Sequence, residues 1–462
     1  MPSPRDSAVD SATVESIYAA KYLATTLGMF VLVFSVGFEA LAVSTIMPLV
    51  SELLDGQKYF ALAFAAPIAS AMLGMVAAGE VSDRRGPKIP LYASVAIFAG
   101  GLLICGTAAD MQVLILGRIL QGIGGGAVTV AIFVLIARAY PAKLHSKIFA
   151  LFAAAGVIPA LLGPWIAGLI ATYLGWRWVF LGVLIFIAFA IVAVIPTLHR
   201  MDSARDATLG PVSIKRLLLA GFTGASVIAM NLLGLMDNGW PSVVALLSAL
   251  ALALLAIRPL LPVGTFSARR GMPATVLTRS LVAGAFFGTE VYLPYLLRED
   301  YFLPPDRAGL VLTASALSWA LGSWLQGKAG ERLSNSACIG IGALAGAFGI
   351  STALYAALFH PPVAIIVVGW AIGGFGMGMI FPRQNVNMLA LSGKQEQGFN
   401  SSAMTMADAL GNAGVTALGG VIFATVAVGL GFAAVFAFSL FLIIVLLVVT
   451  PRIESPAAAG PK

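Results

Sequence analysis

The sequence has few charged residues. Only 10% of its 462 residues are charged, whereas 60% are hydrophobic. A soluble domain carries roughly a quarter charged residues, so this composition excludes a large soluble core and indicates a polytopic membrane protein. The net charge of +7 does not indicate nucleic-acid binding, because the basic residues are divided among loops rather than gathered on one soluble face.

Cysteine is also scarce. Cys105 and Cys338 both lie in apolar runs, which indicates buried, inert thiols rather than a disulfide framework or a zinc site. The three histidines lie in or beside loops, and nothing suggests that they bind a metal or other cofactor. The sequence lacks a Gly-x-x-x-x-Gly-Lys-Ser/Thr phosphate loop, so nothing favours an ATP-driven pump or an enzyme.

Long apolar runs are abundant, and a spanning helix needs about 20 apolar residues. We therefore predict an all-α polytopic membrane protein with about fourteen spans. The predicted spans lie near 24–50, 61–79, 89–107, 111–137, 148–174, 176–196, 216–236, 241–257, 273–297, 307–327, 336–358, 361–390, 398–425 and 428–450.

Lysine and arginine orient these spans, because cytoplasmic loops carry an excess of both residues. With the N-terminus in the cytoplasm, outside loops hold four of the 27 bases and spans hold two, which leaves 21 inside. The six exceptions are Lys58, Arg177, Arg298, Arg307, Arg118 and Arg279. The asymmetry predicts an even number of spans with both termini in the cytoplasm.

An internal repeat divides the chain. Residues 117–124 align with 369–376, and Gly79-x-x-x-Asp83-Arg84 aligns with Gly327-x-x-x-Glu331-Arg332. We predict two pseudo-symmetric six-helix bundles, joined by a linker that adds two central helices. The predicted units are a cytoplasmic tail (1–22), the first bundle (23–200), the linker (201–272), the second bundle (273–451) and a second cytoplasmic tail (452–462).

A charged turn over residues 79–91 separates two apolar runs. An acid and several bases cannot lie in hydrocarbon, so this turn is expected outside the membrane. It resembles the Gly-x-Leu-x-Asp-Arg-x-Gly-Arg-Lys-x-x-Leu loop of the major facilitator superfamily, although Val81 and Pro87 depart from that pattern. The matching residues are Gly79, Asp83, Arg84, Gly86, Lys88 and Leu91. The resemblance implies conformational gating by this turn; the alternative is a cationic loop that only fixes topology.

The six-plus-two-plus-six layout resembles the fourteen-span drug:proton antiporter branch of that superfamily (DHA2-like). Gly163-Pro164-x-x-Ala167-Gly168 resembles the antiporter signature Gly-x-x-x-Gly-Pro-x-x-Gly-Gly, with Pro159 at the first glycine position. Proline bends a helix, and glycines on one face allow close sliding contact. The resemblance therefore implies a gating role for Gly163 and Pro164.

Charges inside spans are costly and need a reason. Glu39 and Pro48, with Ser44 between them, resemble the branch's Asp-x-x-x-x-Asn-x-x-x-Pro helix. Arg118 resembles the arginine of the Leu-x-x-x-Arg-x-x-Gln-Gly motif. We predict that Glu39 loads and releases protons and binds substrate cations, and that Arg118 tunes this carboxylate; the alternative is a permanently ionised structural pair.

Other polar residues within spans are candidates for the substrate path. Glu290, with Tyr292 nearby, could attract a cationic amphiphile, or it could reach the outer interface. Asp408 and Asn412 form a polar face that favours proton coupling or substrate binding over packing. Phe38 adjoins Glu39 and could line the cavity, although such phenylalanine stripes more often pack or face lipid.

We therefore expect a proton-coupled secondary transporter that exports hydrophobic or cationic drug-like compounds by alternating access. It is expected to be a monomer in the bacterial cytoplasmic (inner) membrane, with protons, small substrates and lipid as its partners. One alternative is export of a lipid or endogenous metabolite on the same scaffold. A non-transporting membrane receptor is less favoured, because a scaffold has no need of a buried Glu39 and Arg118.

Overall fold

The computed structural model describes residues 16–201, 211–233, 239–303, 305–426 and 429–454, and within them the chain is helical. The all-α prediction is confirmed. The α-helices are α1 (Ala20–Leu53), α2 (Phe60–Arg85), α3 (Lys88–Gly106), α4 (Met111–Ala139), α5 (Ala142–Tyr173), α6 (Arg177–Leu181), α7 (Val183–Arg200), α8 (Ile214–Leu233), α9 (Trp240–Ile257), α10 (Met272–Glu299), α11 (Pro305–Ala329), α12 (Asn335–Phe359), α13 (Val363–Leu391), α14 (Gln397–Thr425) and α15 (Gly431–Val449). Short 3₁₀ turns are η1 (Gln57–Tyr59), η2 (Arg258–Leu260), η3 (Gly330–Arg332) and η4 (Thr450–Arg452).

Twelve helices of the described chain are long and apolar enough to cross a membrane, with α6 and α7 forming one span. The two remaining long helices, α8 and α11, are not among the twelve, so the fourteen-span count stays a prediction. Most of the two predicted tails, 1–15 and 455–462, lies outside the described residues.

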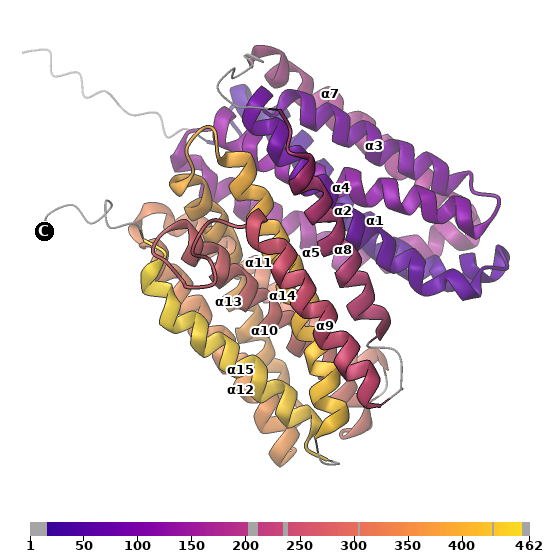
Figure 1. Cartoon of the computed structure of the whole chain (residues 1–462), viewed down its shortest axis with the longest axis vertical. Coiled ribbons are helices and arrows are strands. Elements are labelled where there is room, and N and C mark those ends of the chain that lie inside the picture. Colours follow the sequence, from indigo (N-terminus) through magenta and orange to yellow (C-terminus); the bar gives the residue numbers. More distant parts are fainter. Residues whose placement is uncertain (1–15, 202–210, 234–238, 304, 427–428, 455–462) are drawn as a thin grey trace, which may run out of the picture.

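The helices form two bundles that diverge from a common region (Figure 1). One apolar core lies among α1–α7 and extends onto α8, α9 and part of α14, and a second lies among α10–α15. The repeat reappears in the packing of glycines. A Cβ on Gly122 of α4 would strike α2, and one on Gly374 of α13 would strike α11, so equivalent helices approach closely in each bundle.

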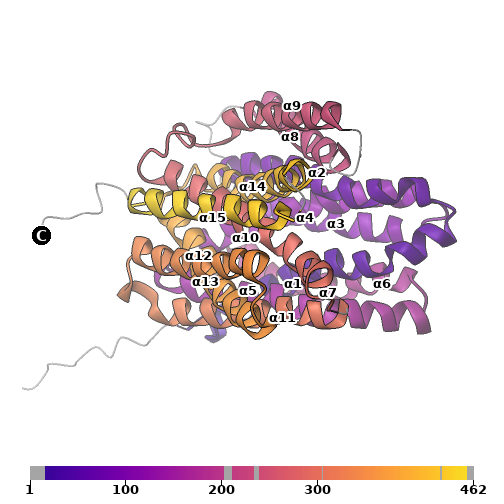
Figure 2. The ribbon, with the colours of Figure 1, turned by 90° about the horizontal axis from the view of Figure 1, so that it is seen from below.

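The additional helices α8 and α9 lie on one side of the molecule, over α2 and α14 (Figure 2). Gly224 of α8 lies against the backbone of Ala69 on α2, where a Cβ would be 2.3 Å from the Ala69 carbonyl oxygen. The pair therefore covers the seam between a helix of the first bundle and a helix of the second.

Local signals explain where several helices begin and end. Asp110 caps α4 by accepting hydrogen bonds from the backbone N–H groups of Gln112 and Val113, both at 2.9 Å. Gly86 ends α2 with a φ of 73°, which favours glycine. Since α2 continues to Arg85 and α3 begins at Lys88, the charged turn predicted over 79–91 is mostly helical.

Candidate functional site

A cavity of about 520 Å³ lies between the two bundles. Its wall is mainly aromatic and aliphatic, and Glu290 is the only charged side chain among the described residues that line it. The lining residues are Val33, Val36, Gly37, Val128, Thr129, Ile132, Phe133, Phe149, Phe152, Ala153, Gly156, Val157, Ala160, Phe287, Glu290, Ser315, Ala316, Trp319, Phe381, Pro382 and Asn385. Such a cavity favours an apolar ligand that carries at most one positive charge.

Glu290 lies in the second half of α10 and is half-buried. Within the described part of the chain it has no ion-pair partner within 4.0 Å and no side-chain hydrogen bond. The Oδ1 atom of Asn385, also in the cavity wall, is buried and lacks a hydrogen-bond partner there. Two polar groups thus face an apolar space without partners, which is the arrangement of a site that binds a polar group of a ligand.

Glu39 and Arg118 form a buried ion pair between α1 and α4. The Arg118 guanidinium also donates to Gln121 Oε1 at 3.0 Å and to the carbonyl oxygen of Ala63 at 3.2 Å. Glu39 is not among the residues that line the central cavity, so the structure places this pair beside the cavity rather than in it.

Asp408 forms a second ion pair, with Arg279 of α10 at 3.1 Å. The guanidinium carbon of Arg279 lies 3.7 Å from the ring centroid of Phe381, whose side chain lines the cavity. Asn412, one turn beyond Asp408, accepts a hydrogen bond from Thr416 at 3.4 Å. The sequence identified Asp408 and Arg279 separately, but their pairing depends on how α10 packs against α14.

Phe38 and Tyr292 lie outside the lining of the cavity. Phe38 is buried and stacks on Phe34, with ring centroids 5.9 Å apart. Tyr292 packs against Phe423 on the far side of α10, with ring centroids 5.8 Å apart. Gly163 lies opposite Phe38, where a Cβ would sit 3.8 Å from its ring, so this glycine belongs to the contact between α5 and α1.

We call the end of the bundle that holds the start of α1 and the end of α15 the terminal face. Here Asp83 of α2 accepts hydrogen bonds from the backbone N–H groups of Gly398 at 2.6 Å and Phe399 at 2.8 Å. These groups belong to the first turn of α14, where a carboxylate is favoured by the helix dipole. Asp83 therefore joins the two bundles.

Gly79 lies one turn before Asp83 and touches α14 directly. A Cβ on Gly79 would lie 2.6 Å from the carbonyl oxygen of Gly398, so only glycine permits this approach. Nearby, Gln326 donates to the carbonyl of Ser146 and Arg138 donates to that of Lys394, both at 3.4 Å. These contacts close the seam between the bundles at the terminal face.

Glu80 was not singled out from the sequence, although it lies inside the charged motif. It forms ion pairs with Arg84, at 2.8 Å, and with Arg216 of α8. The guanidinium of Arg216 lies 5.0 Å from the ring centroid of Phe399 on α14. The sequence contained one indication of this role, because Glu80 is a second acid near the end of a predicted span.

The structure also places the other predicted gating residues. Gly86 ends α2, Lys88 begins α3, and Pro164 is exposed within α5.

Three bacterial multidrug transporters are similar to this chain. The multidrug transporter protein MdtP of Bacillus subtilis is 26% identical over 413 residues, covering 85% of this chain and 74% of MdtP. Multidrug resistance protein 3 of the same organism is 26% identical, covering 87% of this chain and 78% of its own length. The multidrug efflux pump SdrM of Staphylococcus aureus is 24% identical, covering 65% and 67%.

Solved structures share the fold. The human organic anion transporter MFSD10 (TETRAN) superposes with a TM-score of 0.67 at 13% identity, covering 92% of this chain and 99% of that one. The proton:xylose symporter XylE gives a TM-score of 0.65 at 15% identity, covering 93% and 96%. The family model of the Major Facilitator Superfamily matches this chain over residues 29–289 and 275–462. This multi-pass membrane protein therefore belongs to the major facilitator superfamily, whose members are transporters rather than enzymes.

Proposed function

We propose that this chain exports hydrophobic or cationic drug-like compounds in exchange for protons. The observation that carries the proposal is the apolar cavity between the bundles, whose described wall contains one carboxylate, Glu290. Apolar and aromatic walls bind compounds of varied shape, because such contacts are not directional. The multidrug transporters that resemble this chain support the same assignment.

Glu290 provides the attraction for a substrate cation. Phe287 and Trp319 line the same cavity, and aromatic faces also attract cations. A carboxylate without a counter-charge in an apolar wall is neutralised either by a bound cation or by a proton. Competition between these two occupants at Glu290 makes binding of a cationic substrate depend on proton concentration.

The two ion pairs supply the response to protons. Protonation of Glu39 removes the charge that holds Arg118, and protonation of Asp408 does the same for Arg279. Glu39 and Arg118 join α1 to α4, whereas Asp408 and Arg279 join α14 to α10 and adjoin Phe381 in the cavity wall. Loss of a proton from either carboxylate thus changes helix contacts next to the cavity.

The contacts at the terminal face supply the gate. If both termini are cytoplasmic, as the distribution of lysine and arginine predicts, Asp83 and Gly79 close the cavity toward the cytoplasm. Substrate then leaves to the outside, and the seam opens in the opposite state.

We assign the chain to the bacterial cytoplasmic membrane, as its bacterial relatives suggest, and we propose that it acts as a monomer.

Purified protein in liposomes with a pH-sensitive dye inside tests this proposal. With an imposed proton gradient, ethidium should drive proton flux in the wild type. Glu39→Gln should abolish the flux, and Glu290→Gln should abolish flux with ethidium but not with a neutral substrate. Glu52→Gln, an exposed residue on the same helix as Glu39, is the matched control and should behave as wild type. Undiminished flux in Glu39→Gln would refute its role.

Export of a lipid or endogenous metabolite is the second candidate. It is favoured by the same cavity wall, because one carboxylate among so many apolar groups also suits a neutral or amphipathic ligand. Absence of flux with any cationic drug, from protein shown to be folded, would favour this function over drug export.

A further inference from the structure

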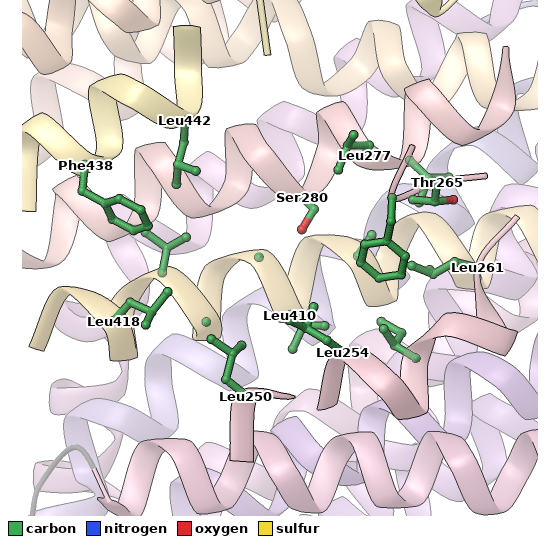
Figure 3. Close-up of a pocket in the computed structure, with 17 residues that line it drawn as sticks. Leu250, Leu254, Leu261, Thr265, Leu277, Ser280, Leu410, Leu418, Phe438 and Leu442 are labelled. Atoms are coloured by element: carbon green, nitrogen blue, oxygen red, sulfur yellow. The ribbon is translucent and has the colours of Figure 1, made fainter. Parts of the chain in front are cut away.

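A second cavity lies outside the central one, against the additional helix α9. It has a volume of about 210 Å³ and lies between α9, α10, α14 and α15. Figure 3 shows side chains from these helices around a common space, with the Ser280 hydroxyl as the one polar group near its centre. Leu250 and Leu254 of α9 form one wall, and Phe438 and Leu442 of α15 form the opposite wall. We call this space the lateral slot.

The lateral slot is open to the surroundings of the bundle. Leu254 is 39% exposed and Phe266, at its mouth, is 53% exposed. In a membrane an open slot of this kind faces hydrocarbon. Water is disfavoured in such a space because it finds too few polar partners, and an empty space would forfeit dispersion contacts. An acyl chain satisfies both conditions.

A wider cavity of about 780 Å³ adjoins the lateral slot at the terminal face. The two cavities share Leu254, Leu261, Thr265 and Phe266 as wall residues. The wider cavity is lined by Arg258, at the end of α9, and by the loop up to Ser267. The apolar slot thus adjoins a second space whose lining is mostly apolar but includes one charged group, the guanidinium of Arg258.

Two further arginines follow in the same loop, Arg269 and Arg270. The stem of Arg269 packs over Gly264, whose φ of 91° and missing Cβ make room for it. Within the described part of the chain, Arg258, Arg269 and Arg270 form no ion pair with a carboxylate within 4.0 Å. Arg258 lines the cavity next to the apolar slot, and Arg269 packs over Gly264 in the wall of that cavity, with Arg270 next to Arg269 in the chain. Exposed guanidinium groups beside an apolar slot are complementary to an amphiphile with a negative head.

We infer that the lateral slot and its arginines bind an anionic phospholipid of the surrounding membrane. One acyl chain occupies the lateral slot between α9 and α15, and the phosphate lies at Arg258, with Arg269 and Arg270 beside it. Basic pockets between membrane helices bind anionic headgroups in this manner. This role of α9 does not depend on which substrate the central cavity transports.

Native mass spectrometry of protein extracted from vesicles of equal phosphatidylglycerol and phosphatidylcholine tests this inference. The wild type should retain phosphatidylglycerol in preference to phosphatidylcholine. Arg258→Gln should lower that preference roughly five-fold. Adding Arg269→Gln and Arg270→Gln to this variant should lower the preference further. Lys143→Gln removes an exposed base near the start of α5, away from the lateral slot, and should change nothing.

A second variant tests the lateral slot without touching any charge. Ser280→Phe places an aromatic ring in the slot and should displace the retained lipid while all three arginines remain. Thermal unfolding of each variant in detergent shows whether it is folded, and added phosphatidylglycerol should raise the unfolding temperature of the wild type and of Lys143→Gln only. Equal retention of both lipids by the wild type would overturn the inference, as would loss of preference in Lys143→Gln.

Discussion

The two bundles use different chemistry at equivalent positions of the repeat. Arg118 of α4 pairs with Glu39 of α1, whereas the aligned residue of α13, Trp370, stacks on Phe286 of α10. The two rings are 4.6 Å apart at their centroids with an angle of 7° between their planes. An ion pair changes when its carboxylate gains a proton, and an aromatic stack does not. The comparison indicates that the contact of α4 with α1 can respond to protons and that the equivalent contact of α13 with α10 cannot. In the second bundle the proposed response rests on a different contact, that of Asp408 with Arg279.

The largest expected effect comes from removing one partner of the ion pair. Arg118→Met leaves Glu39 buried without its counter-charge, which should cost about 3–5 kcal/mol of unfolding free energy. The double variant Arg118→Met/Glu39→Gln should recover most of the thermal stability in detergent but no proton-coupled transport. If the double variant is as unstable as the single one, the pair does not carry the stability assigned to it.

The second largest effect is expected for the glycines at the contact between the bundles, and it concerns the stability of the closed terminal face. Gly79→Ala should destabilise the state closed at the terminal face by about 1–3 kcal/mol, because the added methyl group meets the backbone of Gly398. Its repeat counterpart, Gly327→Ala, should have a smaller effect, because the new methyl group meets one atom within 3.4 Å, the Cβ of Ala150, whereas a methyl group on Gly79 meets three atoms of α14.

Maleimide labelling of Ser146→Cys, a buried position in this seam, measures how far the terminal face opens in each variant. Faster labelling is expected in Gly79→Ala than in Gly327→Ala. Gly340→Ala, where a Cβ would meet nothing within 4 Å, should label as slowly as the parent protein. Equal rates in all three variants would show that the glycine contact does not hold the seam closed.

A smaller effect is expected for the aromatic stack of the second bundle. Trp370→Phe retains a ring opposite Phe286 and should cost about 1 kcal/mol of stability. The pH dependence of transport should remain that of the wild type, whereas Glu39→Gln should abolish transport. A shifted pH profile in Trp370→Phe would remove the proposed distinction between the bundles.

The smallest effect is expected at α8. Arg216 is partly exposed, so Arg216→Gln should cost less than about 1 kcal/mol of stability. It should nevertheless increase labelling of Ser146→Cys, because Arg216 contacts both Glu80 and Phe399 at the closed seam. Lys215→Gln, an exposed neighbour, is the control, and an equal increase there would attribute the effect to charge alone.

The sequence predicted the helices and the family because apolar length and local motifs determine both. It also identified Glu39, Arg118 and Asp408, since charges within apolar runs stand out. It could not predict that Asp408 meets Arg279, or that Asp83 binds the start of α14, because each contact joins segments more than a hundred residues apart. Glu290 and Tyr292 are two residues apart on α10, and only packing shows that one lines the cavity and the other does not.

The attachment of α8 and α9 has a mechanical consequence. Glu80 and Ala69 hold α8 to α2, whereas α9 continues through an ordered loop into α10, where the backbone N–H of Gly271 donates to the carbonyl of Arg452 at 2.7 Å. The α8 end of the pair is thus held mainly to the first bundle, and the α9 end is joined to the second. If the bundles move against each other as proposed, the segment between α8 and α10 must accommodate that motion. We therefore expect the stiffness of residues 239–271 to limit its rate and extent. Lengthening that segment should alter turnover rate more than substrate affinity.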